Sequence, residues 1–336
     1  MLKYIAQDNE YAVDILDRTE INMKQKGNST LLAYLGIIAV VFIWGVIPTA
    51  KKALIGGHFS AAVYSAITTG AGAVALLVIS IKDIKKLNLS YFKMAVPTGL
   101  FVGAAALLQA IAYKYDASPT KQAFLENLSC VIVPILLFII TRKKPSWLTL
   151  LACALCLASS FILGDIFSVG LSFGTADVLN ALAGVFYGIN IAITGIYAKK
   201  YHAPLYVMIQ LFVQAIVSLL VAVAFNLITF DGEPMDKIVF TPDIWLILGA
   251  IGIGVLTNAV CWTVRTVSMK YVSPSVVAVI MPFSAVITGI VAVILGMDTI
   301  SYTLVVGAIL GLVASLTSSI SDVMEAQKSE SKQKNG

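Results

Sequence analysis

The chain has 336 residues, of which 59% are hydrophobic and only 12% are charged, and its formal net charge is +5. An average soluble domain has about 25% charged residues, which cover its surface. This composition excludes an ordinary soluble globular domain and indicates a protein whose surface faces lipid.

Residues 1–30 are polar and nearly balanced in charge, and we expect them to form a cytoplasmic N-terminal tail. No cleavable signal peptide is apparent, because the first apolar run begins only at residue 31 and has the full length of a membrane span. Residues 1–22 could be a tail, an interfacial helix or a misassigned start, so it stays open whether they belong to the native protein.

Ten apolar stretches follow, and each has roughly the 20 residues that a helix needs to cross about 30 Å of hydrocarbon. Backbone polar groups must be paired inside lipid, so stretches of this length should be helices. The sequence therefore predicts an all-α polytopic membrane protein. The stretches are 31–50, 60–81, 94–113, 118–140, 147–164, 178–198, 204–229, 244–264, 273–297 and 301–321.

The basic residues are distributed unevenly about these ten stretches. With the N-terminus inside, 18 of the 23 lysines and arginines fall on the inner side, Arg265 and Lys270 among them. This bias predicts cytoplasmic N- and C-termini in a multi-pass protein of the cell (plasma or inner) membrane. The positive charge thus serves as a topology signal and does not indicate a nucleic-acid partner. Residues 322–336 are expected to form a solvated, disordered cytoplasmic tail.

The fourth stretch is the only one of the ten that contains an acidic residue, Glu126. It lies about 12 Å below the start of the stretch, at a rise of 1.5 Å per residue. A charge at the centre of a bilayer costs about 2.5–3.5 kcal/mol, so Glu126 should face a cavity or a partner. Gln122 lies about 40° from it on a helical wheel, whereas Lys121 lies about 140° away. We therefore treat Glu126 as a candidate for proton coupling or for binding a solute, although a structural bond to a neighbouring helix stays open.

Further polar and aromatic residues inside the stretches are candidates for binding a substrate. Amides inside spans most simply bond to neighbouring helices. Aromatic rings with a polar edge suit amphiphilic or amine-containing solutes, although ordinary packing explains them equally well. With Glu126 and Gln122, the candidate substrate-binding set is completed by Trp44, Gln109, Tyr113, Asn127, Asn180, Tyr187, Asn190, Asn258 and Trp262.

The four cysteines all lie inside apolar stretches. Cys153 and Cys156 form a C-x-x-C pair, a spacing that can bind metal or perform redox chemistry. No second pair and no histidine lies near it in the sequence, so we expect these cysteines to pack as small apolar residues. The sequence indicates neither a cofactor nor a metal.

The ten stretches divide into two similar halves of five, which predicts an internal repeat. An offset of 143 residues places Trp44 on Tyr187 and Gly45 on Gly188. The fourth and ninth stretches both begin with Ser-Pro and contain a second proline, although at a different spacing. Because five is odd, the second half should enter the membrane inverted, as in many secondary transporters. We expect five-helix repeats at 31–164 and 173–321.

At this point the chain resembles the EamA-type transporters of the drug/metabolite transporter superfamily. The resemblance rests on the ten stretches, on Trp44-Gly45 with Lys51 beyond, on the pattern from Ala123 to Pro134, and on Met281-Pro282 with Leu295-Gly296. The chain departs from the pattern at Met281 and Met297, where that family often has glutamate. The resemblance implies transport of small molecules, frequently export.

These observations favour a secondary transporter that moves a small organic solute by alternating access through a central cavity. The cavity would be lined by the first, third, fourth, sixth, eighth and ninth stretches. Its partners would be the solute and the bilayer, and the chain could be a monomer or a homodimer. A channel or passive facilitator stays open as an alternative. An intramembrane enzyme is disfavoured, since both histidines lie between stretches and no second carboxylate lies within one.

Overall fold

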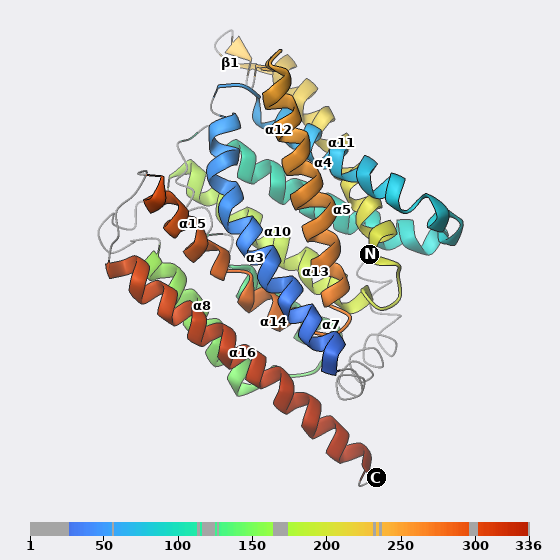
Figure 1. Cartoon of the computed structure of the whole chain (residues 1–336), viewed down its shortest axis with the longest axis vertical. Coiled ribbons are helices and arrows are strands. Elements are labelled where there is room, and N and C mark those ends of the chain that lie inside the picture. Colours follow the sequence, from blue (N-terminus) through green and yellow to red (C-terminus); the bar gives the residue numbers. More distant parts are fainter. Residues whose placement is uncertain are drawn as a thin grey trace.

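The computed structural model describes residues 27–55, 57–112, 115, 125, 128–163, 174–230, 233–234, 237–295 and 302–334. The named elements in these parts of the chain are helices except for one hairpin, formed by the two-residue strands β1 (Thr229–Phe230) and β2 (Glu233–Pro234), which pair antiparallel. Figure 1 shows the hairpin at the opposite end of the molecule from the C-terminal end of the last helix.

The helices of the first half are α3 (Gly27–Ile55), α4 (Ala61–Ile79), the short 3₁₀ helix η2 (Ile81–Lys86), α5 (Leu89–Ala112), α7 (Ser129–Thr141) and α8 (Trp147–Leu163). Those of the second half are α10 (Thr175–Tyr197), α11 (Ala203–Leu227), α12 (Ile244–Gly254), the π-helix η4 (Val255–Cys261), α13 (Trp262–Ser268), α14 (Pro274–Ile280), α15 (Phe283–Ile294) and α16 (Tyr302–Lys334).

Every predicted stretch overlaps an apolar helical run of the structure. Seven runs are long and apolar enough to cross a bilayer, and three are shorter: Ser129–Thr141, Trp147–Ile162 and Val305–Ser321. Large apolar side chains such as Trp245, Ile294 and Leu227 are exposed on the outer surface, as expected where lipid replaces water. The polytopic helical class is thus confirmed, while the count of ten spans stays a prediction.

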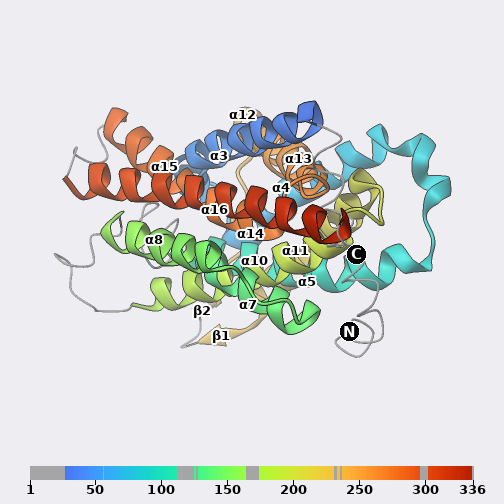
Figure 2. The ribbon, with the colours of Figure 1, turned by 90° about the horizontal axis from the view of Figure 1, so that it is seen from below.

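The contacts between helices repeat when the two halves are exchanged. Helix α10 packs on α5 and α7, and its equivalent α3 packs on α13 and α15. Helix α4 packs on its equivalent α11, and α8 packs along its equivalent α16 (Figures 1 and 2). Each pairing is therefore matched by the one that a two-fold relation between inverted halves requires.

Two equivalent glycines show the same relation at atomic detail. A Cβ on Gly45 would lie 2.4 Å from Ile287, and one on Gly188 would lie 2.8 Å from Ile132. The residues met differ by 155 in number, as do Ser118-Pro119 and Ser273-Pro274. The fourth and ninth stretches therefore align at an offset of 155 residues. Their second prolines, Pro134 and Pro282, do not align at this offset. The absence of a side chain lets α3 and α10 approach these partners closely.

The eighth and ninth stretches, each predicted as a single span, are interrupted in the structure. The eighth contains η4 between α12 and α13, and the ninth turns at Met281 and Pro282 between α14 and α15. Proline cannot donate a hydrogen bond to the preceding turn, which accounts for the second break. π-Helices are rare and occur frequently at functional sites.

The C-terminal segment also differs from its prediction. Helix α16 continues to Lys334, well past residue 321, where a disordered tail was expected. The physical reason lies in composition, because the segment from Asp322 to Lys334 contains no glycine or proline and is rich in the good helix formers Glu, Gln and Lys. High polarity therefore did not imply disorder, and solvation of this segment stays a prediction.

The cysteines behave as expected for packing residues. All four are free and buried, and the Cys153 thiol donates to the carbonyl of Cys130 across the contact between α8 and α7 (3.2 Å). The C-x-x-C pair therefore holds two helices together through ordinary contacts.

The loop that precedes α11 lies against η2. Lys86 contacts Asp83 (2.7 Å), and His202 lies 3.9 Å from the same carboxylate. The hydrogen bond from Lys86 lowers the pKa of Asp83, whereas burial lowers the pKa of His202. These groups lie outside the spans and form a polar cap over one end of the helices.

The close contact of α12 with α4 yields a stability prediction. A Cβ on Gly254 would lie 2.3 Å from the carbonyl oxygen of Thr68, which is backbone and cannot rotate away. Gly254→Ala should lower the free energy of unfolding by about 1–3 kcal/mol through overpacking. Thermal unfolding in detergent measures this effect.

Gly252→Ala is the matched control. Gly252 lies on the same helix, but a Cβ there would meet nothing within 4 Å. It should leave the melting temperature unchanged or raise it, since alanine is the better helix former. Equal melting temperatures for the two variants would show that the α12–α4 contact does not constrain the fold.

Candidate substrate-binding site

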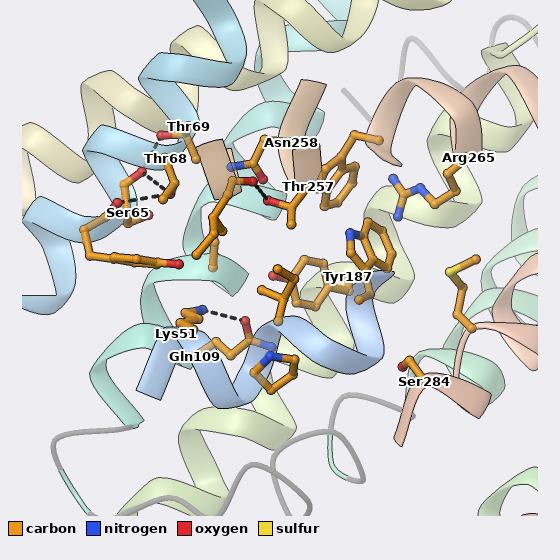
Figure 3. Close-up of a pocket in the computed structure, with 18 of the residues that line it drawn as sticks. Lys51, Ser65, Thr68, Thr69, Gln109, Tyr187, Thr257, Asn258, Arg265 and Ser284 are labelled. Carbon is orange, nitrogen blue, oxygen red and sulfur yellow. Dashed lines mark hydrogen bonds between the residues drawn. The ribbon is translucent and has the colours of Figure 1, made fainter. Parts of the chain in front are cut away.

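A cavity of about 150 Å³ lies between the two halves of the molecule. Its walls come from α3, α4, α5 and α7 of the first half and from α10, α12, η4, α13 and α15 of the second (Figure 3). Helix α4, from the second stretch, was not among the predicted lining helices. The lining consists of Trp44, Ile47, Pro48, Lys51, Tyr64, Ser65, Thr68, Thr69, Ala106, Gln109, Ser129, Tyr187, Ile191, Ile253, Thr257, Asn258, Trp262, Arg265, Met281 and Ser284.

Three aromatic rings form one wall of this cavity. The ring centroids of Trp44 and Trp262 are 5.6 Å apart, and those of Tyr187 and Trp262 are 6.1 Å apart. Trp44 and Tyr187 are equivalent in the two repeats, and both meet the same indole. Their separations fall in the range at which aromatic pairs attract each other.

Arg265 lies beside this aromatic wall and is almost fully buried, with 1% of its surface exposed. Its guanidinium carbon is 3.7 Å from the ring centroid of Trp262 and 5.8 Å from that of Trp44. One terminal nitrogen donates a hydrogen bond to Oδ1 of Asn190 (2.9 Å). A planar guanidinium stacks on aromatic faces while its N–H donors remain in the plane of the group.

This placement corrects the interpretation of Arg265 as a cytoplasmic topology signal. The helix of the eighth stretch continues to Ser268 and does not end at residue 264, so Arg265 lies inside it. Trp262 is three residues earlier and therefore lies on the same helix face, which is the sequence signal that could have identified Arg265.

A buried hydrogen-bond network extends from Arg265 into the bundle. Asn190 donates to the carbonyl of Thr98 (3.2 Å), and the Thr98 hydroxyl donates to the carbonyl of Met94 (2.7 Å). The same hydroxyl then accepts from Tyr206 (2.8 Å) and from the amide of Gln210 (2.9 Å). The network thereby joins α13, α10, α5 and α11, with its one shared hydroxyl fully engaged.

The far part of the cavity is polar and has a second cation. The ammonium of Lys51 donates to Oε1 of Gln109 (2.9 Å), and the two side chains point toward each other in Figure 3. The Thr69 hydroxyl donates to a carbonyl within α4 (2.6 Å), and the Thr257 hydroxyl donates from η4 to the carbonyl of Ile253 in α12 (2.7 Å). Asn258 and Thr257 both reach the cavity from the π-helix η4.

The structure brings five predicted site residues together in the lining: Trp44, Gln109, Tyr187, Asn258 and Trp262. Asn190 is fully buried behind the lining, where it holds Arg265. Asn180 is buried in α10 and is not part of the lining. Tyr113, Gln122, Glu126 and Asn127 lie outside the described residues. Binding of a substrate by any of them stays a prediction.

Sequence reasoning missed Arg265, Lys51 and the hydroxyls of α4. The two cations were assigned to the membrane boundary because each lies at the end of an apolar stretch. Serine and threonine are common in membrane helices, so Ser65, Thr68 and Thr69 carried no distinguishing signal. Among the residues that the structure describes, no group of three or more His, Cys, Asp or Glu could hold a metal ion.

A family model of the EamA-like transporter family matches residues 31–164 and 174–320, one copy in each half of the chain. The chain belongs to this family. It is accordingly an integral, multi-pass membrane transporter of the drug/metabolite transporter superfamily, with the two-repeat architecture of EamA proteins.

This EamA chain has the same fold as a solved structure whose description reads only "Crystal structure of protein". It superimposes with a TM-score of 0.68 at 14% identity, over 88% of this chain and 97% of the other. Comparison with curated proteins finds no match. At this identity the likeness shows the fold alone.

The hydroxyl of Thr98 generates a prediction about this EamA fold. Thr98→Val keeps the shape of the side chain but leaves the Tyr206 hydroxyl and the Gln210 amide without their shared acceptor. Each buried group that loses its partner costs about 1–3 kcal/mol, so the melting temperature in detergent should fall.

Thr317→Val is the matched control, because that hydroxyl donates to the carbonyl of Val313 within its own helix (2.8 Å). Its effect should stay within about 0.5 kcal/mol. A Thr98→Val protein as stable as the Thr317→Val protein would show that the network does not hold the bundle together.

Proposed function

We propose that this chain is a secondary transporter that exports a small organic solute by alternating access. The observation that carries the proposal is the cavity itself, since its walls come from both halves and combine aromatic rings with a few polar and cationic groups. Sites of this composition are typical of small-molecule binding. In transporters built from inverted repeats, the substrate binds between the halves.

The interrupted helices support alternating access. Thr257 and Asn258 belong to the π-helix, Met281 lies at the turn between α14 and α15, and all three reach the cavity. Weakened backbone hydrogen bonding at such points lets a helix bend while its ends stay packed. Bending of α12–α13 and α14–α15 would open one side of the cavity as the other closes.

Proton coupling through Glu126 is the energy source that we propose. In the register of 155 residues that relates the fourth and ninth stretches, Glu126 is equivalent to Met281, which reaches the cavity. The same position in the two repeats would then provide an ionisable group in one half and part of the apolar wall in the other. Ionisable residues inside membrane segments commonly belong to proton relays.

We further propose that both chain termini face the cytoplasm of a cell membrane. Moving Arg265 into the bundle leaves seventeen basic residues on the inner side against five on the outer side. The bias therefore stays strong without it.

Replacement of the acid tests the coupling. The protein is reconstituted in liposomes that contain a pH-sensitive dye, and amino acids, amines, nucleosides and sugars are added in turn. An accepted solute should drive proton movement in the unchanged protein, and Glu126→Gln should abolish it while the folded protein is retained.

Asp83→Asn is the control, because Asp83 lies in η2 outside the spans. It should leave proton movement intact. Solute-driven proton flux that persists in Glu126→Gln would rule out the coupling role, and flux that rises without saturation would favour the alternative of a channel.

A further inference from the structure

Arg265 is a cation fixed in the wall of a cavity inside a membrane protein. Charges in such positions are costly and usually mark the path of a substrate or ion. We propose that the solute carries a carboxylate and that Arg265 binds it. This inference rests on the proposed function, because it names the class of substrate for the same cavity.

The surroundings of Arg265 fix the direction of its donors. The indole of Trp262 lies 3.7 Å from the guanidinium carbon and covers one face of the group. Asn190, which is not part of the cavity lining, accepts a hydrogen bond from a terminal nitrogen of Arg265 (2.9 Å). Figure 3 shows the guanidinium directed from α13 toward the aromatic wall. A guanidinium held in this way is preorganised to meet a planar carboxylate with two parallel N–H donors.

The sign of charge in the lining favours an anion over an amine. Lys51 and Arg265 are both cationic and no lining residue in the described ranges is acidic, so the lining keeps a net positive charge even with the single acid Glu126 that we propose for proton coupling. Cationic solutes would approach two like charges in an environment where electrostatic interactions are strong. The aromatic wall alone suits amines, but the cations beside it select the opposite charge.

The size of the cavity limits the rest of the solute. A space of about 150 Å³ is comparable with an engineered protein cavity that binds benzene. One ring or a short branched chain would fill it, with Trp44, Tyr187 and Ile191 as the apolar contacts. The expected substrate is therefore a small organic acid with a compact apolar body.

Matched acids, amides and amines test the charge preference directly. Benzoate, benzamide and benzylamine, and likewise leucine and leucinamide, are added to the purified full-length protein in detergent. Binding is followed by the shift in melting temperature and by tryptophan fluorescence, to which Trp44 and Trp262 should contribute. At least one acid should bind about tenfold more tightly than its amide. Failure of every acid to bind, or amides that bind as tightly as their acids, would overturn the inference.

Variants then locate the preference. Arg265→Gln should remove the preference of acid over amide, and Arg265→Lys should reduce it, because lysine keeps the charge but loses the planar fork. Lys200→Gln is the matched control, since Lys200 is also a cation near aromatic rings, at 6.0 Å from Tyr197, but lies outside the lining. If Arg265 served only to hold the network, its variants would lower the melting temperature and leave the ratio of acid to amide binding unchanged.

Flux measurements separate this inference from the proposed function. Bound acids that also cross proteoliposome membranes support both. Acids that bind but are never transported would contradict the transporter proposal and leave the carboxylate site standing. Transport confined to neutral or cationic solutes would support the transporter proposal and contradict the carboxylate site.

Discussion

The contact between Arg265, Trp262 and Asn190 is the interaction on which the centre of the molecule depends. A bilayer offers no water to a buried guanidinium, so the protein must supply both a face and hydrogen-bond acceptors for it. Trp262 supplies the face at 3.7 Å, and Asn190 supplies one acceptor at 2.9 Å. Asn190 is in turn held by Thr98, which also bonds Tyr206 and Gln210. The position of the cation is thereby connected to four helices.

The same contact connects the cavity with the symmetry of the fold. Trp44 and Tyr187 are related by the repeat, yet both meet Trp262, which belongs to one half only. The frame is thus symmetric while the binding surface is not. In the transport cycle that we propose, the symmetric frame would provide two related arrangements of the halves, and the asymmetric lining would provide one solute site that either arrangement exposes. Gly45 and Gly188 preserve the frame because no side chain separates their helices from Ile287 and Ile132.

Much of the fold follows from the sequence because the bilayer imposes one simple rule. Long apolar stretches must be helices, so the helical class, the approximate bounds and the paired halves were predictable. The π-helical break was not, since the eighth stretch is apolar on both sides of η4 and its pattern does not mark where the helix changes its hydrogen bonding. The helical extension of α16 was missed because polarity was given more weight than helix propensity.

The candidate site was predictable in its aromatic part and hidden in its cationic part. The repeat identified Trp44 and Tyr187, and an amide or indole inside a span identified Gln109, Asn258 and Trp262. Arg265 and Lys51 lie at the ends of apolar stretches, where basic residues usually anchor a helix at the membrane surface. Only the three-dimensional structure shows that the cavity extends far enough to include both.

The central claim is that one cavity between the two halves opens to each side of the membrane in turn. A single cysteine at Ser284, which lines the cavity, tests it in a protein whose four native cysteines are replaced. In oriented proteoliposomes, a membrane-impermeant maleimide should label this cysteine from one side, and an accepted solute should shift the labelling toward the other side. Labelling that is equal from both sides and indifferent to every solute would contradict alternating access and indicate an open pore.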